Sequence, residues 1–552
     1  MAATQDQPRG PVLDDAVSSR DDLQGAAARV FGWQSLRDEQ LTAMSAILDG
    51  RDVLAVMPTG SGKSAIYQVP AVLLPRPVIV ISPLIALQHD QIASLEQSDA
   101  PMAVAINSRH SATVLDEALA AVEKGDARYV FLGPEQLMKD DLLKRLAAVR
   151  PSLIVIDEAH CVSAWGHEFR PTYLRVGDAI ERLGRPPVTA LTATASAVVR
   201  REIVDFLGLR EPLVISGGFD RPNISLDVRH HTDDGRKREE VLDVVAELAK
   251  PGLLYCATRR DTEYYAEQLT ERAVSAVEYH AGLSTKQRND VHDRFRDGEV
   301  DVVVATSAFG MGIDKPNVRF VVHASVPDSV DAYYQQIGRA GRDDEPADAV
   351  LFYRAEDLSL GSFFATRNPD EDLLHRVYAA LDPKKPKRLK GLRDELDERG
   401  RRLTASINLL EQAGAVTSAR AGFTSAGVPA DDAVRRAVDM AEIGERVDRT
   451  RVEMMRSYAE TPDCRRQFLL AYFGDHLPQP CGNCDSCRAN TATDHESAIP
   501  AGTAVEHREW GAGTVLGGDD ERITVLFDLY GYRTLALDAV RDNDLLDVPD
   551  SA

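Results

Sequence analysis

Short apolar runs alternate with amphipathic stretches through roughly the first two thirds of the chain. They lie at 52–57, 77–83, 128–132, 153–156 and 188–191, and again at 252–257, 301–306, 319–323 and 348–353. Continuous apolar runs of this length are typical of strands buried on both faces of a parallel sheet, and the stretches between them have helical patterns. The alternation predicts two α/β domains built on parallel sheets, with a cleft between them.

Two polar segments directly follow these runs. The first is Thr59-Gly60-Ser61-Gly62-Lys63-Ser64. Its glycines let backbone N–H groups close around phosphate, Lys63 would reach the β- and γ-phosphates, and Ser64 would ligate Mg²⁺. A Gly-Lys-Ser turn in a surface loop is the alternative, because Met57 stands where the full pattern has glycine. The second segment, Asp157-Glu158, places metal-binding carboxylates at the carboxyl edge of a sheet, which favours a nucleotide site.

An aromatic and basic segment follows the two carboxylates. It contains Trp165, His167, Phe169 and Arg170, side chains suited to stacking on bases and pairing with phosphate. A nucleotide-hydrolysis element directly beside a nucleic-acid contact suggests a motor.

Two further segments offer candidate catalytic chemistry. Gln335-Gln336-Ile337-Gly338-Arg339-Ala340-Gly341-Arg342 places Arg339 and Arg342 three residues apart on a predicted helix, hence on one face, where they could stabilise a transferring phosphoryl group. A solvated basic helix face is the alternative, although Gly338 and Gly341 would weaken an ordinary surface helix. Near the N-terminus, the segment 31–40 offers a glutamine able to bond an adenine edge.

Taken in order, these segments resemble the RecQ family of superfamily 2 DNA helicases over roughly residues 25–355. The matching segments are FGWQSLRDEQ (31–40), MPTGSGKS (57–64), ISPLIALQHDQ (81–91), DEAHCVSAWGHEFRPTY (157–173), LTATA (191–195), LLYCATRRDTE (253–263), YHAGL (279–283), VVATSAFGMGIDKPNVRFVVH (303–323) and QIGRAGRD (336–343). The loop WGHEFRPTY is the most specific, because other superfamily 2 branches lack it. The resemblance implies two tandem RecA-like domains, at 26–213 and 214–365, and translocation from 3′ to 5′.

The resemblance also implies residue roles. Arg37 and Gln40 read adenine, Asp157 binds Mg²⁺ through water, and Glu158 orients the attacking water. Arg339 and Arg342 act across the cleft, while Trp165, Phe169 and Arg170 couple single-strand contact to hydrolysis. The implied catalytic set is Lys63, Asp157, Glu158, Gln335, Arg339 and Arg342. The implied nucleotide contacts are Arg37, Gln40, Thr59, Gly60, Ser61, Gly62, Lys63, Ser64 and Asp314, and the implied DNA contacts are Trp165, His167, Phe169 and Arg170.

Composition changes this picture in three ways. The 552 residues allow three or more domains, with residues 1–25 predicted as a disordered arm because they are rich in Asp, Ala, Gly and Ser. The net charge of −23 argues mildly against a nucleic-acid binder and predicts salt sensitivity, but a motor needs only a positive track and the motifs outweigh it. No apolar run has the length of a signal peptide core or a membrane span, so we expect a cytoplasmic, nucleoid-associated protein.

The six cysteines divide into two kinds. Cys161 and Cys256 lie within the domain segments and are predicted to be reduced packing residues. The other four offer enough thiolates for a closed structural Zn²⁺ site with the spacing C-x16-C-x2-C-x2-C, namely Cys464, Cys481, Cys484 and Cys487. Disulfides are the alternative, which the lack of a secretory signal disfavours. The surrounding sequence resembles the RecQ zinc module, so a helical zinc-binding module is predicted at 431–490.

Residues 366–430 depart from the family's order. Helical periodicity at 371–381, 389–397 and 402–414 precedes a turn-rich stretch, 416–427, that could be a wing. We therefore predict a winged-helix-like insertion before the zinc module, which leaves open whether strands are separated by the family's usual hairpin wedge. The basic run Lys384 to Lys390 could meet DNA phosphates or could be a solvated linker.

The C-terminal residues show β alternation. After a linker at 491–500, short strands with glycine-rich turns at 501–552 predict a five-stranded SH3-like barrel. The pattern V-x-H-x-x-x-G-x-G-x-V from Val505 resembles the Tudor-like tail of UvrD/PcrA-type helicases, which contacts RNA polymerase, and so implies a protein partner. We expect His507 to stabilise the barrel and not to bind metal, because no ligand cluster surrounds it.

Two functional classes remain. The first is an ATP-dependent 3′–5′ DNA helicase that uses ATP, Mg²⁺ and structural Zn²⁺ and acts on single-stranded and forked or tailed duplex DNA in repair or recombination. The second is a DNA-stimulated translocase that remodels or recruits proteins, for example at RNA polymerase, without efficient strand separation. A P-loop protein that merely binds DNA is the simplest third interpretation.

Overall fold

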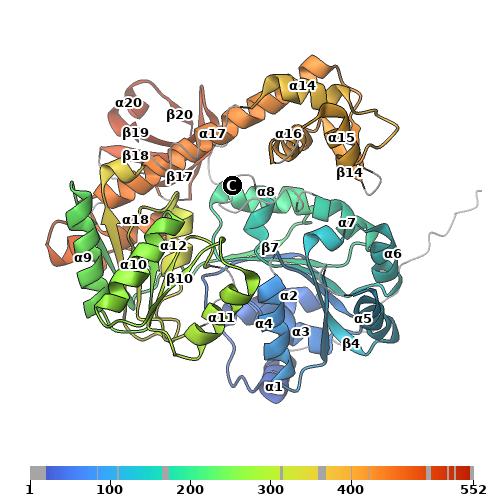
Figure 1. The fold of residues 1–552 in the computed structure, drawn as a ribbon, viewed down its shortest axis with the longest axis horizontal. Coiled ribbons are helices and arrows are strands. Elements are labelled where there is room, and N and C mark those ends of the chain that lie inside the picture. The colour runs from blue at the N-terminus through green and yellow to red at the C-terminus, as the bar shows by residue number, and fades with distance from the viewer. Residues whose placement is uncertain are drawn as a thin grey trace, which may run out of the picture.

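A computed structural model of the chain shows two α/β lobes side by side, with a helical module and a small sheet above them (Figure 1). The structure describes residues 20–83, 85–107, 111–137, 139–163, 173, 175–310, 315–358, 369–398, 401–419, 422–492, 499–500, 502–518, 521–527 and 530–547. None of the helices in these ranges combines the length and the apolar character that a membrane crossing requires.

The first lobe is a seven-stranded parallel sheet in the order β3-β4-β2-β5-β6-β1-β7. Its strands are β1 (Val53–Val56), β2 (Val78–Ile81), β3 (Met102–Ile106), β4 (Ala127–Leu132), β5 (Leu153–Ile156), β6 (Val188–Thr192) and β7 (Leu213–Ser216). Its helices are α1 (Arg20–Phe31), α2 (Asp38–Leu48), α3 (Ala65–Leu73), α4 (Ile85–Glu96), α5 (Ala112–Lys124), α6 (Asp140–Ala148), α7 (Val176–Arg182) and α8 (Ala197–Leu207). The inner strands β1, β2, β5 and β6 are fully buried, as their apolar runs predict.

Two predicted boundaries of this lobe differ from the structure. Helix α1 begins at Arg20 and buries Leu23, Ala26 and Ala27, so residues 20–25 are helical although they were predicted to belong to a disordered arm. Strand β7 pairs with β1 along its whole length. The first sheet therefore extends to Ser216, past the boundary predicted at residue 213.

The second lobe is a six-stranded parallel sheet in the order β10-β11-β9-β12-β13-β8. Its strands are β8 (Ile224–His230), β9 (Gly252–Tyr255), β10 (Ala276–Tyr279), β11 (Val302–Ala305), β12 (Phe320–His323) and β13 (Ala347–Tyr353). Its helices are α9 (Asp234–Glu247), α10 (Arg259–Glu271), α11 (Thr285–Arg296) and α12 (Val330–Ile337). Two parallel-sheet lobes were predicted, and the structure contains both.

The inserted module has three helices and a β-hairpin. They are α14 (Glu371–Ala379), α15 (Leu389–Leu396), α16 (Arg401–Gln412), β14 (Val416–Ala419) and β15 (Gly422–Ser425). The backbone of Lys387, just before α15, pairs with Phe423 through N–H···O contacts of 3.0 and 2.8 Å, which adds an isolated bridge beside the two-stranded hairpin. The module has its own apolar core, which is shared only with the start of the next helix, α17 (Ala430–Glu460).

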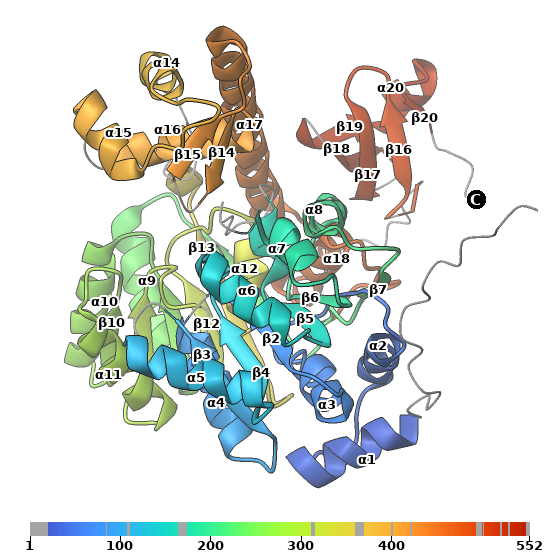
Figure 2. The same cartoon turned by 90° about the vertical axis from the view of Figure 1, so that its right-hand side faces the viewer.

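Helix α17 runs from the inserted module to the rest of the protein (Figure 1), and the module and the C-terminal sheet stand on either side of it (Figure 2). After it come α18 (Arg465–Tyr472) and α19 (Asp485–Arg488). The C-terminal sheet is five-stranded and antiparallel, in the order β19-β18-β17-β16-β20. Its elements are β16 (Ala504–His507), β17 (Gly511–Gly518), β18 (Arg522–Phe527), β19 (Gly531–Ala536), α20 (Leu537–Asp542) and β20 (Leu546–Asp547).

The C-terminal sheet is docked on the lobes through buried hydroxyl groups. Tyr532 of β19 is hydrogen-bonded to Tyr472 of α18, and Tyr472 donates to Asp331 at the start of α12. Within the sheet, His507 stacks on Trp510 at 4.1 Å, and its Nδ1 accepts from the N–H groups of Glu509 and Trp510. His507 thus stabilises the turn between β16 and β17, while its predicted role in a barrel stays a prediction.

Candidate nucleotide site and zinc-binding cluster

The glycine-rich loop lies between β1 and α3 at the carboxyl edge of the first sheet. Gly60 and Gly62 have φ angles of +80° and +75°, a region that residues with a Cβ avoid. The Lys63 ammonium donates to the carbonyls of Met57 and Pro58, at 2.9 and 3.1 Å. The loop therefore curls around its own lysine, whose ammonium is held by backbone carbonyls.

The charges at this edge are buried. Burial lowers the pKa of Lys63 to about 8, against the opposing effect of Glu158 and Asp157. Burial likewise raises the pKa of Asp157, while the nearby Lys63 lowers it. A buried amine facing a buried carboxylate is the charge arrangement that a phosphate chain with a divalent cation requires, because each partner would gain a counter-charge.

The two carboxylates are fixed by the backbone and by a neighbouring histidine. Glu158 adopts φ +50°, and its N–H donates to Asp157 Oδ1 at 3.0 Å. Glu158 Oε2 lies 3.4 Å from His160 Nδ1, which is also 2.9 Å from Thr192 Oγ1. The Asp-Glu-Ala-His turn after β5 is thus connected to the Leu-Thr-Ala-Thr-Ala segment at the end of β6.

Polar side chains from two other helices reach the loop. Gln40 donates from Nε2 to the carbonyls of Ser61 and Gly62, both at 3.0 Å, and its Oε1 accepts from the Arg37 N–H at 2.9 Å. Gln91 of α4 donates to Ser64 Oγ at 3.3 Å and is itself bonded by Tyr67. Gln91 lies in a motif noted in the sequence but was not predicted as a site residue.

The second lobe closes directly onto this loop. Thr59 Oγ1 donates to the Gly338 carbonyl at 3.0 Å. A Cβ on Gly338 would lie 2.6 Å from Thr59 Oγ1, and a Cβ on Gly60 would lie 3.2 Å from Arg342 Cγ. Both glycines are therefore needed for the approach of the two lobes, and Arg342 lies against the glycine-rich loop.

The two predicted arginines do not share a helix face, so that prediction was wrong. Helix α12 ends at Ile337, and Gly341 has φ +56°, so residues 338–342 form a turn because glycine weakens the helix there. Arg339 is 4% exposed and donates to the Gly310 carbonyl, whereas Arg342 lies against the loop of the other lobe. Gln335 is buried in α12. Trp165, His167, Phe169, Arg170 and Asp314 lie outside the described residues.

Sequence reasoning missed a cation at the junction of the lobes. Arg221, between β7 and β8, donates to the Thr59 carbonyl at 3.4 Å and to the Ala340 and Gly341 carbonyls at 3.1 and 2.7 Å. Asn223 donates to the same Gly341 carbonyl at 2.8 Å. All of these acceptors are backbone carbonyls, so no pattern of residue types in the sequence indicates that Arg221 joins the two lobes.

The four predicted zinc ligands come together. The sulfur atoms of Cys464, Cys481, Cys484 and Cys487 all lie within 4.8 Å of one another, and no described cysteine forms a disulfide. The Sγ atoms of Cys481 and Cys487 are 3.9 Å apart. Tetrahedral zinc with ~2.3 Å Zn–S bonds needs sulfur atoms ~3.8 Å apart, so the cluster fits a closed Zn²⁺ site. Cys161 and Cys256 are buried, as predicted.

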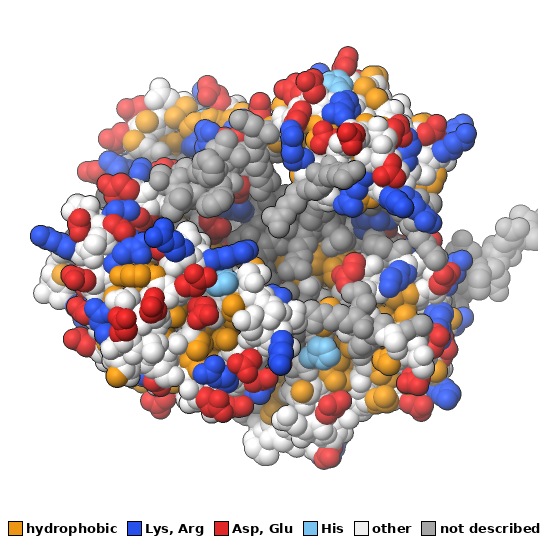
Figure 3. Space-filling model, in the orientation of Figure 1, with side chains coloured by type: hydrophobic (Ala, Val, Ile, Leu, Met, Phe, Trp, Pro, Cys, Tyr) orange, Lys and Arg blue, Asp and Glu red, His pale blue; other side chains and the backbone are white. Residues whose placement is uncertain are grey.

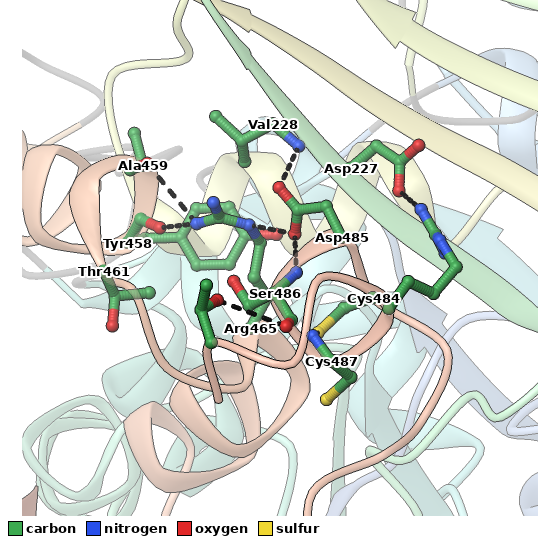
Figure 4. A network of polar contacts seen from close by, with 12 residues as sticks. Asp227, Val228, Tyr458, Ala459, Thr461, Arg465, Cys484, Asp485, Ser486 and Cys487 are labelled. Atoms are coloured by element: carbon green, nitrogen blue, oxygen red, sulfur yellow. Dashed lines mark hydrogen bonds and ion pairs between the residues drawn. The ribbon is translucent and has the colours of Figure 1, made fainter. Parts of the chain in front are cut away.

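The cysteine cluster is fastened to the edge strand of the second lobe (Figure 4). Asp485 accepts from Arg465 Nε at 2.6 Å and from the Val228 N–H at 3.0 Å. Arg465 also donates to the Tyr458 carbonyl at 2.7 Å, and Arg488 pairs with Asp227. The cluster and β8 therefore behave as one structural unit.

Family comparisons follow this division of the chain. A DEAD/DEAH box helicase family matches residues 37–202, the helicase conserved C-terminal domain matches 236–344, and the RecQ zinc-binding family matches 432–488. The chain is 35% identical over 459 residues to the ATP-dependent DNA helicase RecQ of Pasteurella multocida, covering 83% of this chain and 61% of that relative. It is 32% identical over 477 residues to RecQ of Bacillus subtilis, covering 86% of this chain and 68% of that relative.

The chain belongs to the RecQ family. It spans about three fifths of the length of its Pasteurella relative, 61%. Among solved structures, the helicase MrfA bound to DNA is similar in fold, with a TM-score of 0.52 at 17% identity over 77% of this chain and 64% of that one. That likeness supports the RecA-like fold of the two lobes, and the RecQ membership accounts for the zinc-binding cluster that follows them.

Proposed function

We propose that this RecQ-family chain is an ATP-dependent DNA helicase that moves from 3′ to 5′ on single-stranded DNA and acts in repair or recombination. The observation that carries the proposal is the approach of the two lobes at one cleft, where Thr59 meets Gly338 at 3.0 Å and Arg342 lies against Gly60. ATP hydrolysed between two lobes can change their spacing, which is how a motor steps along a strand. The names of the RecQ relatives agree with this activity.

In this proposal, residues of the first lobe bind ATP and its metal. The N–H groups of Thr59 to Gly62 and the Lys63 ammonium would hold the phosphates, while Ser64 and Asp157 would hold Mg²⁺. Lys63 would have to leave the Met57 and Pro58 carbonyls, at 2.9 and 3.1 Å, to reach phosphate. Arg37 and Gln40 would contact adenine, with Asp314 completing the nucleotide contacts.

The catalytic step is proposed to use both lobes. Glu158 would orient the attacking water, and the Glu158 carboxylate is itself held by His160, whose Nδ1 lies 3.4 Å from Oε2. Arg342 would neutralise charge on the transferring phosphoryl group, and Gln335 and Arg339 would support it from the same segment. Arg339 is tied to the Gly310 carbonyl, so its contribution would require a change in that contact on nucleotide binding.

DNA is proposed to contact the segment Trp165–Arg170 and the inserted module. In Figure 3, Lys and Arg side chains gather along the lower edge of that module, beside the indentation that separates it from the first lobe. Five basic side chains of this module are exposed, namely Lys384, Lys385, Arg388, Lys390 and Arg393. Three helices with a hairpin support a winged-helix interpretation of residues 366–430, whose basic side chains would meet duplex phosphates.

The deciding experiment is strand displacement on a 3′-tailed duplex. We expect ATP-dependent unwinding of the 3′-tailed substrate and none of a matched 5′-tailed substrate, with activity abolished in Lys63→Ala and Glu158→Gln. DNA-stimulated ATP hydrolysis without displacement would instead identify a translocase that remodels or recruits proteins. Hydrolysis indifferent to DNA would refute both.

For the C-terminal residues 501–552 we propose an SH3-like barrel of the Tudor-like type that binds a protein partner such as RNA polymerase. The support is a five-stranded antiparallel sheet, the number of strands that was predicted, and a glycine-rich β17. A pull-down with the full chain and purified RNA polymerase tests this, with a chain ending at residue 499 as the control. Equal recovery by both chains would refute it.

A further inference from the structure

The chain crosses from the first lobe to the second through residues 219–224, which we name the connector. Both of its ends are anchored. The Phe219 ring stacks on Phe473 of the zinc-binding module at 5.1 Å, and the Phe219 carbonyl accepts from Tyr334 of α12. At the other end, the Ile224 carbonyl accepts from Arg466 at 2.6 Å. The connector is therefore held by the zinc-binding module and by the second lobe.

Two further contacts come from the same module. Arg466 also pairs with Asp220 at 3.3 Å, and Asn483, between two of the zinc ligands, donates to the Pro222 carbonyl at 3.2 Å. Arg466 is 5% exposed, and its contact with the Ile224 carbonyl is buried, whereas the Asp220 side chain is 37% exposed. Arg221 is thus flanked on both sides by residues that the zinc-binding module holds.

Arg221 itself reaches both sides of the nucleotide cleft. One guanidinium nitrogen faces the Thr59 carbonyl of the first lobe, and the other donates to the Ala340 and Gly341 carbonyls of the second. A planar guanidinium offers donors in a fixed fork and can serve two chain segments at once, which a lysine ammonium cannot do with the same geometry. The two segments that it joins carry the glycine-rich loop and Arg342.

We propose that Arg221 is a positioning residue that holds the glycine-rich loop against the Gly338–Arg342 turn, and that the zinc-binding module sets its position through Arg466. The proposal rests on the proposed ATPase function for its consequence in catalysis. Loss of Arg221 would loosen the closed arrangement of the lobes while leaving the phosphate contacts of the first lobe intact. Hydrolysis would then fall more than nucleotide binding.

The test compares Arg221→Lys and Arg221→Ala with the wild-type full chain, with Arg229→Gln as the control. Arg229 is also in the second lobe, but it pairs with Glu240 at 2.6 Å, away from the cleft. We expect kcat for DNA-stimulated ATP hydrolysis to fall at least tenfold in both Arg221 variants, with less than threefold change in the Kd of a fluorescent ATP analogue. Hydrogen exchange at residues 57–64 should rise, although these lie in the other lobe.

If Arg221→Lys has the wild-type kcat and the wild-type hydrogen exchange at residues 57–64, the proposal is overturned, because a positive charge without the guanidinium geometry would then be enough to hold the loop. If Arg221→Ala does not fold, Arg221→Lys decides. A wild-type chain without ATP hydrolysis would contradict the proposed function only, since the exchange measurement at 57–64 still tests the contact.

The part played by the zinc-binding module is tested by a matched pair of arginines. Arg466 holds the connector, whereas Arg488 holds β8 beyond it, through Asp227 and through Ser225 at 3.0 Å. We expect Arg466→Gln to raise exchange at 57–64 while one zinc per chain is retained, and Arg488→Gln to leave that segment unchanged. Equal exchange at 57–64 in the two variants would overturn this part.

Discussion

A methyl group on Gly338 should act as a wedge between the lobes. The added carbon would lie 2.6 Å from Thr59 Oγ1, where ordinary contact begins at 3.4 Å. Either Thr59 rotates away and loses its 3.0 Å hydrogen bond to the Gly338 carbonyl, or the lobes separate. The lost bond alone costs about 1 kcal/mol, and overpacking of this kind costs about 1–3 kcal/mol. If closure limits hydrolysis, Gly338→Ala should lower kcat by about 5- to 150-fold.

A double-mutant cycle separates the wedge from other effects. Thr59→Ala removes the clashing oxygen and its hydrogen bond, so Gly338→Ala should have little further effect in that background, with a coupling of about 1 kcal/mol or more. Steady-state ATP hydrolysis with saturating single-stranded DNA provides the four rates. Gly391→Ala is the control, because its added carbon would find Lys387 Cγ at an ordinary 3.6 Å. Independent, multiplicative effects of the two substitutions would refute the wedge.

Three further predictions concern stability, zinc and DNA. His323 is fully buried, and burial lowers its pKa to about 4. In the unfolded chain this histidine has a pKa near 6.5. Its neutral form therefore contributes fully to the stability of the fold above about pH 6.5, and this contribution is lost at about 1.4 kcal/mol per pH unit as the pH falls toward 4. Between pH 7 and pH 5, the free energy of unfolding of His323→Gln should therefore fall by about 2 kcal/mol less than that of the wild type, as measured by chemical denaturation. An equal fall in both proteins would contradict this. We expect elemental analysis to find one zinc per wild-type chain and none in Cys484→Ser, whose unfolding temperature should also fall. Cys256→Ser is the control and should keep the metal. Zinc retained in Cys484→Ser would count against the site. The double variant Arg388→Glu, Lys390→Glu should bind duplex DNA more weakly. If both residues contact phosphate, the slope of log binding constant against log salt concentration should fall in magnitude by about 2. An unchanged slope would exclude both residues as phosphate contacts.

The basic run shows why charge in a sequence does not locate a binding surface. Lys387 lies at its centre, yet its ammonium donates to the Ala380 carbonyl and pairs with Glu395 at 2.7 Å. Its substitution should therefore change the stability of the module more than DNA affinity. Arg388 and Lys390 are exposed and carry the DNA prediction.

The interior strands could be predicted and the edges could not. Every apolar run identified in the sequence is a strand, whereas β3, β7, β8 and β10 were missed, and these are the outer strands of the two sheets. An outer strand of a sheet is less buried than an inner one, so fewer of its positions need apolar residues and it leaves no continuous apolar run in the sequence. Strand β10 has no fully buried residue, and β7 alternates between half-buried and exposed positions.

The part of the candidate nucleotide site that depends on characteristic side chains could be predicted from the sequence. Phosphate and metal binding leave recognisable residues, and Lys63, Asp157 and Arg342 do lie near enough for their charges to act on one another, while their roles toward a nucleotide stay predictions. The turn at 338–342 was mistaken for a helix, since spacing alone cannot tell where glycine ends the helix. Arg221 left no pattern, because its acceptors are carbonyl groups that every residue has.

Helix α17 also sets a mechanical scale. Its 31 residues form one continuous rod, about 46 Å long at 1.5 Å per residue. One end packs against the C-terminal sheet and α12, and the other forms part of the core of the inserted module. Such a rod acts as a lever: a tilt of about 5° at its base would carry the far end through about 4 Å, close to the ~3.4 Å rise of one nucleotide. If the module contacts DNA as proposed, a tilt of this size would displace it by about one nucleotide.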